Sequence, residues 1–186
     1  MWLVKPLSSA ARNSTHSAAV PIYSFPPIAE IDARLLILGT MPGKISLAQQ
    51  QYYAHPRNAF WPIMGELLGF DARVDYAERT AQLLRADIAV WDVLQSCIRS
   101  SSLDADIDMA SEVANDFAEF LARHSEIRRI GFNGAKAAQL FRRHVLKQLP
   151  PSDRRELEFR FLPSTSPAHA GMNFETKLQA WRQILD

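Results

Sequence analysis

Cysteine is scarce in this sequence, and neither sign of charge predominates. Cys97 is the only cysteine in 186 residues, which excludes an internal disulfide and a zinc or iron–sulfur site built from thiolates. The single thiol favours a reducing, cytoplasmic setting. Because 21 Lys and Arg residues nearly balance 20 Asp and Glu residues, the net charge is only +1. Composition alone therefore does not indicate a nucleic-acid-binding protein, and a basic surface would require local sorting of charge.

Long apolar runs are also absent. No run is long enough to cross a membrane, and residues 1–20 have no continuous apolar core of signal-peptide length. We expect residues 1–24, which are small and polar, to form a poorly ordered tail. An arm that contacts nucleic acid through Lys5 and Arg12 is the alternative. The remaining residues, 25–186, are expected to form one domain, since the composition is 47% hydrophobic and 22% charged.

Short apolar segments alternate with helical patterns along the chain. The segments 34–38, 87–91, 127–132 and 157–162 read as buried strands. Helices are expected over 46–53, 59–68, 76–84, 110–124, 135–146 and 174–185, and 94–108 is expected to be a loop. This alternation predicts parallel β-α-β units with right-handed crossovers. We therefore predict an α/β protein, a three-layer α/β/α domain with a central four-stranded parallel sheet.

Two of the helical patterns predict which side chains are buried. Val113, Phe117, Phe120 and Leu121 lie on one face of the helix expected over 110–124. In the last helix we expect Leu178, Trp181 and Leu185 to point inward.

A tight loop follows the first predicted strand. It reads Gly39-Thr40-Met41-Pro42-Gly43. Without a Cβ, Gly39 and Gly43 can take positive φ and let a ligand approach the backbone N–H groups, while Pro42 fixes φ. Open α/β sheets bind their ligands at this position, beyond the carboxyl end of a strand.

Polar and aromatic side chains are concentrated after this loop. Tyr52, Tyr53, His55, Arg57, Asn58, Phe60 and Trp61 fall within ten residues. In a parallel sheet this region would meet the segment after Trp91, the Asn133-Gly134 turn and the Pro163–Pro167 loop, since all follow strand ends. The sequence thus predicts one composite site at this edge.

Four segments in order carry a resemblance to a known family. They are 34–61, 91–107 (WDVLQSCIRSSSLDADI), 132–141 (FNGAKAAQLF) and 162–170 (LPSTSPAHA). Over residues 25–186 the chain resembles the uracil-DNA glycosylase superfamily, most closely its hypoxanthine (deoxyinosine) DNA glycosylase branch. The resemblance implies a monofunctional glycosylase that hydrolyses the N-glycosidic bond of deaminated bases, chiefly hypoxanthine, in base excision repair. It implies a DNA substrate with a deaminated base, a monomer, and no metal, cofactor or membrane.

The resemblance also implies a catalytic residue. In mismatch-specific relatives an Asn directly follows the first Gly of the loop, but Thr40 stands there. Asn58, 18 residues later, supplies an amide that the hypoxanthine branch is understood to use. Asn58 is therefore the expected catalytic residue, which either orients water or contacts the departing base. The competing interpretation is a cap for the following helix.

The remaining expected site residues bind the base or the DNA backbone. By resemblance, the base would be bound by Thr40, Met41, Tyr53, Phe60 as stacking platform, and Asn133, whose Asn-Gly setting is equally typical of a turn. The DNA and its phosphates would be bound by Gly39, Pro42, Gly43, His55, Ser164, Thr165, Ser166 and His169. The segment from Ser96 to Ile107 resembles the substrate-facing loop of the family, and Asp92 could cap a turn.

Other functions stay open at this point. A uracil or thymine mismatch glycosylase would share the fold, and a non-catalytic nucleotide- or DNA-binding module would use Asn58 only as a cap. A hydrolase that uses Ser166 and His169 is disfavoured, because the sequence has no nucleophile-elbow pattern.

Overall fold

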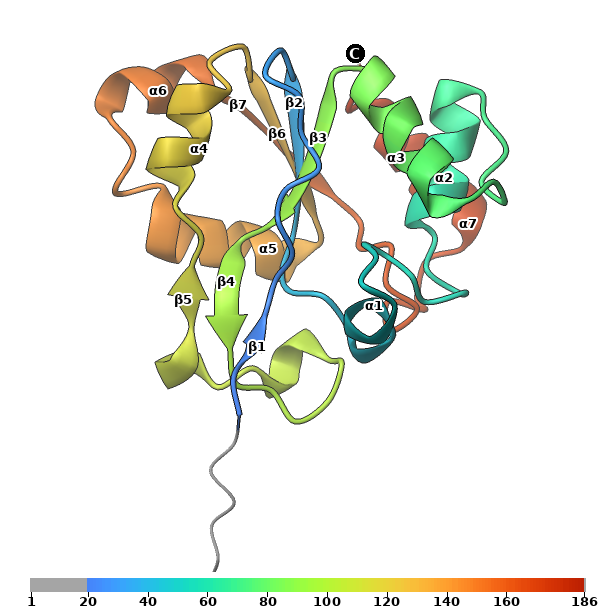
Figure 1. Ribbon diagram of the computed structural model, residues 1–186, viewed down its shortest axis with the longest axis horizontal. Helices are drawn as coiled ribbons and strands as arrows, with labels where there is room; N and C mark the ends of the chain where they lie inside the picture. The colour runs from blue at the N-terminus through green and yellow to red at the C-terminus, as the bar shows by residue number, and fades with distance from the viewer. Residues whose placement is uncertain (1–19, 186) are drawn as a thin grey trace, which may run out of the picture.

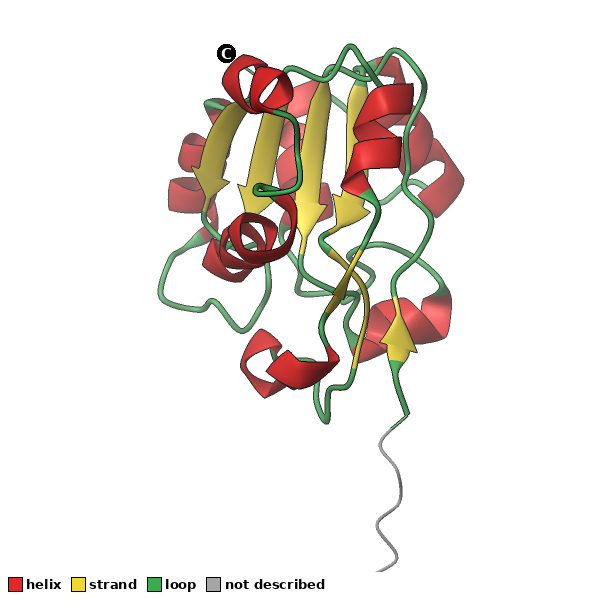
Figure 2. Cartoon of the chain, turned by 90° about the vertical axis from the view of Figure 1, so that its left-hand side faces the viewer, coloured by secondary structure: helices red, strands yellow, loops and turns green. Residues whose placement is uncertain are grey.

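A four-stranded parallel sheet forms the centre of the computed structural model, which describes residues 20–185 except for the side chains of Ser152 and Asp153. Its strands are β2 (Leu35–Gly39), β3 (Ile88–Asp92), β6 (Arg129–Asn133) and β7 (Glu158–Leu162). They lie in the order β3-β2-β6-β7, and Figure 2 shows them side by side with the same direction. The predicted sheet is confirmed.

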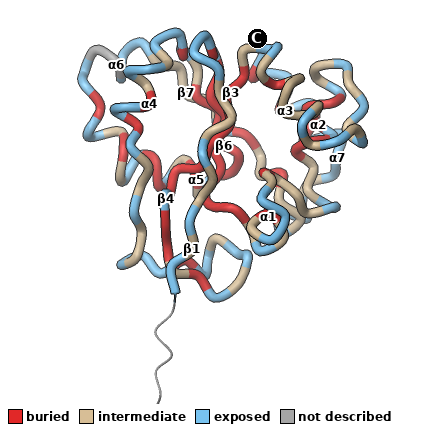
Figure 3. The backbone as a smooth tube through the Cα atoms, in the orientation of Figure 1, coloured by how far each residue is buried: buried red, intermediate tan, exposed pale blue. Residues whose placement is uncertain are grey.

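The middle of this sheet is buried because its strands are apolar on both faces. Leu36 pairs with Ala89 of β3 and with Ile130 of β6. Every residue of β2 and β3 is buried, as the red central segments of Figure 3 show. Continuous apolar runs are typical of parallel strands that helices cover on both sides.

Helices flank the sheet on both faces (Figure 1). On one side lie α2 (Phe60–Leu68), α3 (Tyr76–Arg85) and α7 (Phe174–Arg182). On the other lie α4 (Phe117–Arg123), α5 (Ala135–Leu140), which continues as a π-helix over Phe141–Val145, and α6 (Pro151–Glu156). The predicted three-layer arrangement is therefore correct.

Several helices begin at residues whose side chains cap them. Asp75, Asp116 and Asn173 each accept a hydrogen bond from a backbone N–H in the first turn of α3, α4 and α7. Such caps satisfy N–H groups that have no partner within the helix. After α7, Ile184 packs so closely on β6 that a Cβ at Gly131 would lie 2.2 Å from its Cδ1, which explains the glycine in that strand.

A second, antiparallel sheet was not predicted. The loop expected over 94–108 begins instead as β4 (Leu94–Cys97), which pairs with β1 (Ile22–Tyr23) and β5 (Val113–Ala114). β1 falls within the tail expected over 1–24, and residues 1–19 of that tail lie outside the described residues. These strands are too short to give a recognisable sequence pattern.

Helix boundaries differ from the prediction in three places. The helix expected over 110–124 was wrong before residue 117: β5 occupies part of it, and α4 starts only after Asp116 caps it. The helix expected over 46–53 is α1 (Lys44–Gln49), which ends because Gln50 adopts φ 53°. The α6 helix was missed because Pro151 starts this helix, as proline can at a first helical position.

One core assignment in the last helix was also wrong. Leu178 and Trp181 are buried as expected, but Leu185 is 42% exposed and Ile184 takes the buried position. The last turn after Arg182 no longer follows the α-helical period, so the inward direction shifts by one residue.

Candidate active site

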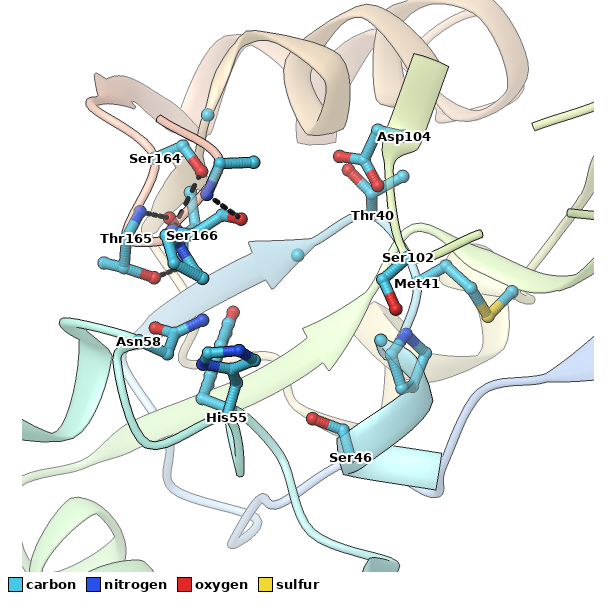
Figure 4. A pocket seen from close by; sticks show the side chains of 18 of the residues that line it. Thr40, Met41, Ser46, His55, Asn58, Ser102, Asp104, Ser164, Thr165 and Ser166 are labelled. Atoms are coloured by element: carbon cyan, nitrogen blue, oxygen red, sulfur yellow. Dashed lines mark hydrogen bonds between the residues drawn. The ribbon is translucent and has the colours of Figure 1, made fainter. Parts of the chain in front are cut away.

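A cavity of about 580 Å³ lies where the strands of the parallel sheet end. Its volume is in the range of small-molecule sites, about 300–1,000 Å³. The segments that line it are Gly39–Ser46, Tyr52–Asn58, Ser102–Asp104, Asn133–Lys136 and Ser164–His169, together with Asp92. Figure 4 shows His55 and Asn58 on one side and Thr40, Ser102 and Asp104 on the other. Every predicted site residue except Phe60 lines this cavity.

Asn58 stands in the turn just before α2 and lines the cavity. Its Oδ1 accepts a hydrogen bond from the N–H of Phe60 at 3.0 Å, at the start of α2. The amide nitrogen remains on the cavity side (Figure 4). The carbonyl end of the amide therefore holds the helix start, while the N–H₂ end can donate to a ligand.

His55 is oriented by its own turn. Its Nδ1 accepts a hydrogen bond from the N–H of Arg57 at 3.1 Å, and the N–H of Asn58 donates to the carbonyl of His55 at 2.8 Å. Since Nδ1 is an acceptor, the neutral ring carries its proton on Nε2, which can donate to an anion or to a base.

The predicted stacking platform is not at the cavity. Phe60 is fully buried and its ring stacks against Tyr53, with centroids 3.9 Å apart and planes inclined by 23°. Tyr53 lines the cavity in its place. It does so with φ 56°, in the left-handed region that non-glycine residues rarely adopt and that is often found at functional sites. Tyr53 therefore replaces Phe60 as the candidate aromatic wall of the cavity.

Asp92 lies at the base of the cavity, at the carboxyl end of β3. It is 3% exposed, and its Oδ2 has no hydrogen-bond partner among the described residues, nor has the Tyr53 hydroxyl. Burial, and secondarily the nearby Asp104, raise the pKa of Asp92 to about 8, against the opposing effect of Arg99. Burial also raises the pKa of Tyr53 far above its ordinary value.

The first loop glycine makes room for these two groups. A Cβ at Gly39 would lie 2.4 Å from Asp92 Oδ1 and 3.1 Å from the Tyr53 hydroxyl. Positive φ, which glycine permits, is not used at Gly39 or Gly43: among the described glycines only Gly69 and Gly134 have it. The requirement at Gly39 is therefore close approach rather than backbone conformation.

A buried arginine, Arg99, supports the loop that follows β4. Arg99 donates to the carbonyl of Pro42 and lies 3.7 Å from Asp104, with only 1% of its side chain exposed. Burial raises the pKa of Asp104, and the neighbouring Thr40 side chain lowers it to a smaller extent. The Gly39 loop and the loop after β4 are thereby joined on one side of the cavity (Figure 4).

Asn133 is hydrogen-bonded to Thr165. Its Nδ2 donates to Thr165 Oγ1, and its Oδ1 accepts from the N–H of Thr165, both at 2.8 Å. Each end of the amide thus makes one bond within the protein, which leaves the second N–H of Nδ2 for a base edge, and reading of the base by Asn133 stays a prediction. Thr165 is 1% exposed and its carbonyl accepts from the N–H of Ala59 at 3.0 Å. Its predicted phosphate-binding side chain is turned into the protein.

The two serines beside Thr165 keep the Pro163–Pro167 loop in shape. Ser164 Oγ accepts from the N–H of Ser166, and Ser166 Oγ from the N–H of Ala168, both at 3.2 Å. Gly134 faces Ser164 with φ 103°, and a Cβ there would lie 3.0 Å from the serine Cβ. Only glycine suits this position. His169 is exposed at the rim of the cavity.

Titratable side chains of both signs line the cavity, the acidic ones being Asp92 and Asp104. Lys44, Lys136, His55 and His169 all line the cavity. Lys136 lies 3.6 Å from Glu112, whose carboxylate also binds Arg143 and His144 at 2.7 Å. Within residues 20–185 no three His, Cys, Asp or Glu side chains are grouped so that they could hold a metal ion.

Sequence reasoning missed Asp92, Ser102, Asp104 and Lys136 as cavity residues. The position of Asp92 directly after a buried strand was a usable signal, but the capping interpretation was preferred. Ser102 and Asp104 lie in the loop that the resemblance marked as substrate-facing. Lys136 lies in the segment 132–141 that carries the resemblance, but the sequence assigned it no role.

Fold and cavity together define an α/β/α protein with a ligand site at the carboxyl edge of its sheet. The family model of the uracil DNA glycosylase superfamily matches residues 26–185. Hypoxanthine DNA glycosylases of Methanosarcina barkeri and Methanosarcina acetivorans are each 34% identical over 116 residues, 62% of this chain and 72% of the relative. The solution NMR structure of a candidate uracil DNA glycosylase from Methanosarcina acetivorans has a TM-score of 0.72 and 30% identity, and covers 89% of this chain and 99% of that one. The chain belongs to the uracil DNA glycosylase superfamily.

The helices between residues 20 and 185 were compared with the length and hydropathy of a membrane span. Between residues 20 and 185, none of them has both the length and the apolar content needed to cross a membrane.

Proposed function

We propose that this protein is a monofunctional DNA glycosylase that hydrolyses the N-glycosidic bond of deaminated bases, hypoxanthine in the first place. One observation carries the proposal: a single cavity brings together the Asn58 amide, the Tyr53 ring and the loops of Gly39–Gly43 and Ser164–Ser166. Two relatives named hypoxanthine DNA glycosylase support the choice of base.

The chemistry requires an extruded nucleotide. A base inside a duplex cannot reach the bottom of a cavity, so the enzyme must flip it out and hold it by its faces and edge. Tyr53 offers the aromatic face, and base–aromatic stacking is worth about 1–3 kcal/mol. The cavity-side N–H₂ of Asn58 can donate to the base as its bond to the sugar breaks, and so stabilise developing negative charge.

The rim groups would hold the DNA backbone. His55 can donate through Nε2, and Lys44, Lys136 and His169 lie around the opening. Contacts of this kind fix the position of the nucleotide without reading sequence. We further propose that the protein acts as a monomer in the cytoplasm, a setting supported by its single, buried cysteine, Cys97.

The test is base release from matched duplexes that carry one inosine or one uracil, with alkali to reveal abasic sites. We expect release from inosine. Asn58→Asp should keep the bond from Oδ1 to the Phe60 N–H but lose the N–H₂ donor, so release should fall by about 100-fold or more while the fold is retained. Asn58→Ala should lose both.

Asn173→Ala is the matched control. Asn173 is the N-cap of α7, its Oδ1 accepts from the N–H of Thr176 at 2.9 Å, and it does not line the cavity. It should lower stability by about 1 kcal/mol and leave release unchanged. Full activity of Asn58→Asp would reduce Asn58 to a cap. Release from uracil alone would make the protein a uracil glycosylase, and binding of inosine DNA without release would make it a binding module.

A further inference from the structure

The base of the cavity holds an acidic side chain that the function proposed above does not use. Asp92 is 3% exposed, it lines the cavity, and its Oδ2 has no hydrogen-bond partner among the described residues. Buried polar groups are almost always hydrogen-bonded, because an unpaired one raises the free energy of the folded state. Since Oδ2 is sealed from solvent, Oδ1, which lies beside Gly39, is the carboxyl oxygen that a ligand in the cavity can reach, and no described residue donates to it.

Asp92 does not have the surroundings of a structural carboxylate. Asn115, the polar neighbour that reaches this strand end, donates to the main-chain oxygen of Asp92 at 2.8 Å and not to its carboxyl. The strands on either side of β2 end in Asp92 and Asn133, and the neighbouring residue of β2 is Gly39. Neither Gly39 nor Asn133 carries a charge that could hold a carboxylate.

The charged and titratable groups that face Asp92 act in opposite directions. Asp104, from the loop after β4, raises its pKa, and Arg99 from the same loop lowers it, while burial is the largest cause and raises it. Tyr52 and Tyr53, from the segment after α1, also interact with it. The cations Lys44 and Lys136 and the imidazoles of His55 and His169 lie elsewhere on the cavity wall. With its pKa raised to about 8, the Asp92 carboxyl holds a proton at higher pH than an ordinary carboxyl does, and in that form it can donate a hydrogen bond.

We propose that Asp92 is the general acid of the reaction and gives its carboxyl proton to the departing base. This inference rests on the function proposed above, and it assigns a second catalytic group to the same cavity. Asn58 and Asp92 approach the cavity from different elements, the start of α2 and the end of β3. Asn58 can stabilise the departing base by donating a hydrogen bond to it, and Asp92 can transfer a proton to it.

The step balances as follows. The electron pair of the C1′–N9 bond leaves with the base, and the Asp92 proton moves to an acceptor atom of hypoxanthine, so that the base departs neutral. Water adds to C1′ of the sugar and loses a proton, which restores the Asp92 carboxyl directly or through solvent. One water is consumed and one neutral base is released. A general acid is most effective when its pKa lies near the working pH.

The experiment measures the single-turnover rate of hypoxanthine release from an inosine duplex across pH, from about pH 6 to about pH 9. The wild-type rate should fall on the alkaline side as Asp92 loses its proton. Asp92→Asn keeps the size and a hydrogen-bond donor but cannot transfer a proton. It should bind the duplex as tightly as wild type, release base about 100-fold more slowly, and lose the alkaline fall.

Asp104→Asn provides a second measurement that does not alter Asp92 itself. Removal of the Asp104 charge removes a cause that raises the pKa of Asp92, so the alkaline fall should move to lower pH. If Asp92 had only a structural role, the alkaline fall in rate would stay at the same pH in this variant. The inference is overturned if Asp92→Asn retains the wild-type rate and alkaline fall, or if the profile of Asp104→Asn stays in place. Absence of release by the wild-type protein would instead overturn the proposed function itself.

Discussion

Asp92 and Asn133 occupy comparable positions but have opposite surroundings. They end β3 and β6, the two strands that flank β2, and both are buried beside the same cavity. Asn133 has both ends of its amide bonded to Thr165, whereas Asp92 has an oxygen without a partner among residues 20–185. Position at a strand end therefore does not decide whether a polar residue supports the structure or serves the ligand. The presence of an internal partner does.

The largest expected effect concerns the pH dependence of stability. The pKa of Asp92 is about 8 in the folded protein and has a reference value of 3.8, so between these values the folded state binds one more proton than the unfolded state. Stability then falls as pH rises through this window, by about 1.4 kcal/mol per pH unit, and levels off above it. Asp92→Asn removes this contribution.

Urea unfolding of both proteins at several pH values measures the difference. The stability of Asp92→Asn relative to wild type should rise by on the order of 4 kcal/mol between about pH 5 and about pH 8. Comparison with the variant cancels the groups that the two proteins share. If the difference in unfolding free energy between the two proteins does not change with pH, Asp92 is ionised in the folded protein over this range. Its surroundings would then stabilise the charge, and it would not differ from Asn133 in lacking internal partners.

Asn133→Ala should have the next largest effect, in the opposite direction. It leaves the buried N–H and hydroxyl of Thr165 without the bonds that they now make, and each unsatisfied group costs about 1–3 kcal/mol. We expect a loss of about 2–4 kcal/mol in the free energy of unfolding at every pH. Base release should fall as well, because the Ser164–Ser166 loop loses its support. An unchanged free energy of unfolding would mean that Asn133, like Asp92, serves to bind the ligand and does not stabilise the fold.

Tyr53→Phe should have the smallest effect on stability. The tyrosine hydroxyl has no partner within the described part of the chain, so its removal leaves no bond broken, and the ring can keep its stack on Phe60. We expect a change of about 0.5 kcal/mol or less in thermal or urea unfolding. A loss of more than about 2 kcal/mol in the free energy of unfolding would show that the hydroxyl makes a hydrogen bond within the protein, as the Asn133 amide does.

Most of the fold could be predicted, because it depends on local patterns. The apolar runs of β2 and β3 and the alternation with helices determine the parallel sheet and its layers. The antiparallel sheet could not be predicted, since Ile22 pairs with Cys97 and strands of two to four residues leave no period to detect. The start of α4 was missed because one capping side chain, Asp116, decides it.

The site could be predicted as a set of residues but not as a set of roles. Parallel order was enough to bring the loops after β2, β6 and β7 together. Which aromatic ring faces the cavity depends on the φ of Tyr53, a backbone choice with no sequence signature. Whether Asn133 is free depends on Thr165, 32 residues away. Partners that are distant in sequence decide roles, and a single sequence does not report them.

Thr165 has a consequence for how this protein can change over evolutionary time. It bonds to Asn133 through its side chain and main chain, and to Ala59, next to Asn58, through its carbonyl. A substitution that shifts one of these loops is transmitted to the others. The effects of mutations around Asn58 and around Ser164 should therefore be epistatic, so that new base preferences arise more readily through paired substitutions in the two loops than through successive changes in one.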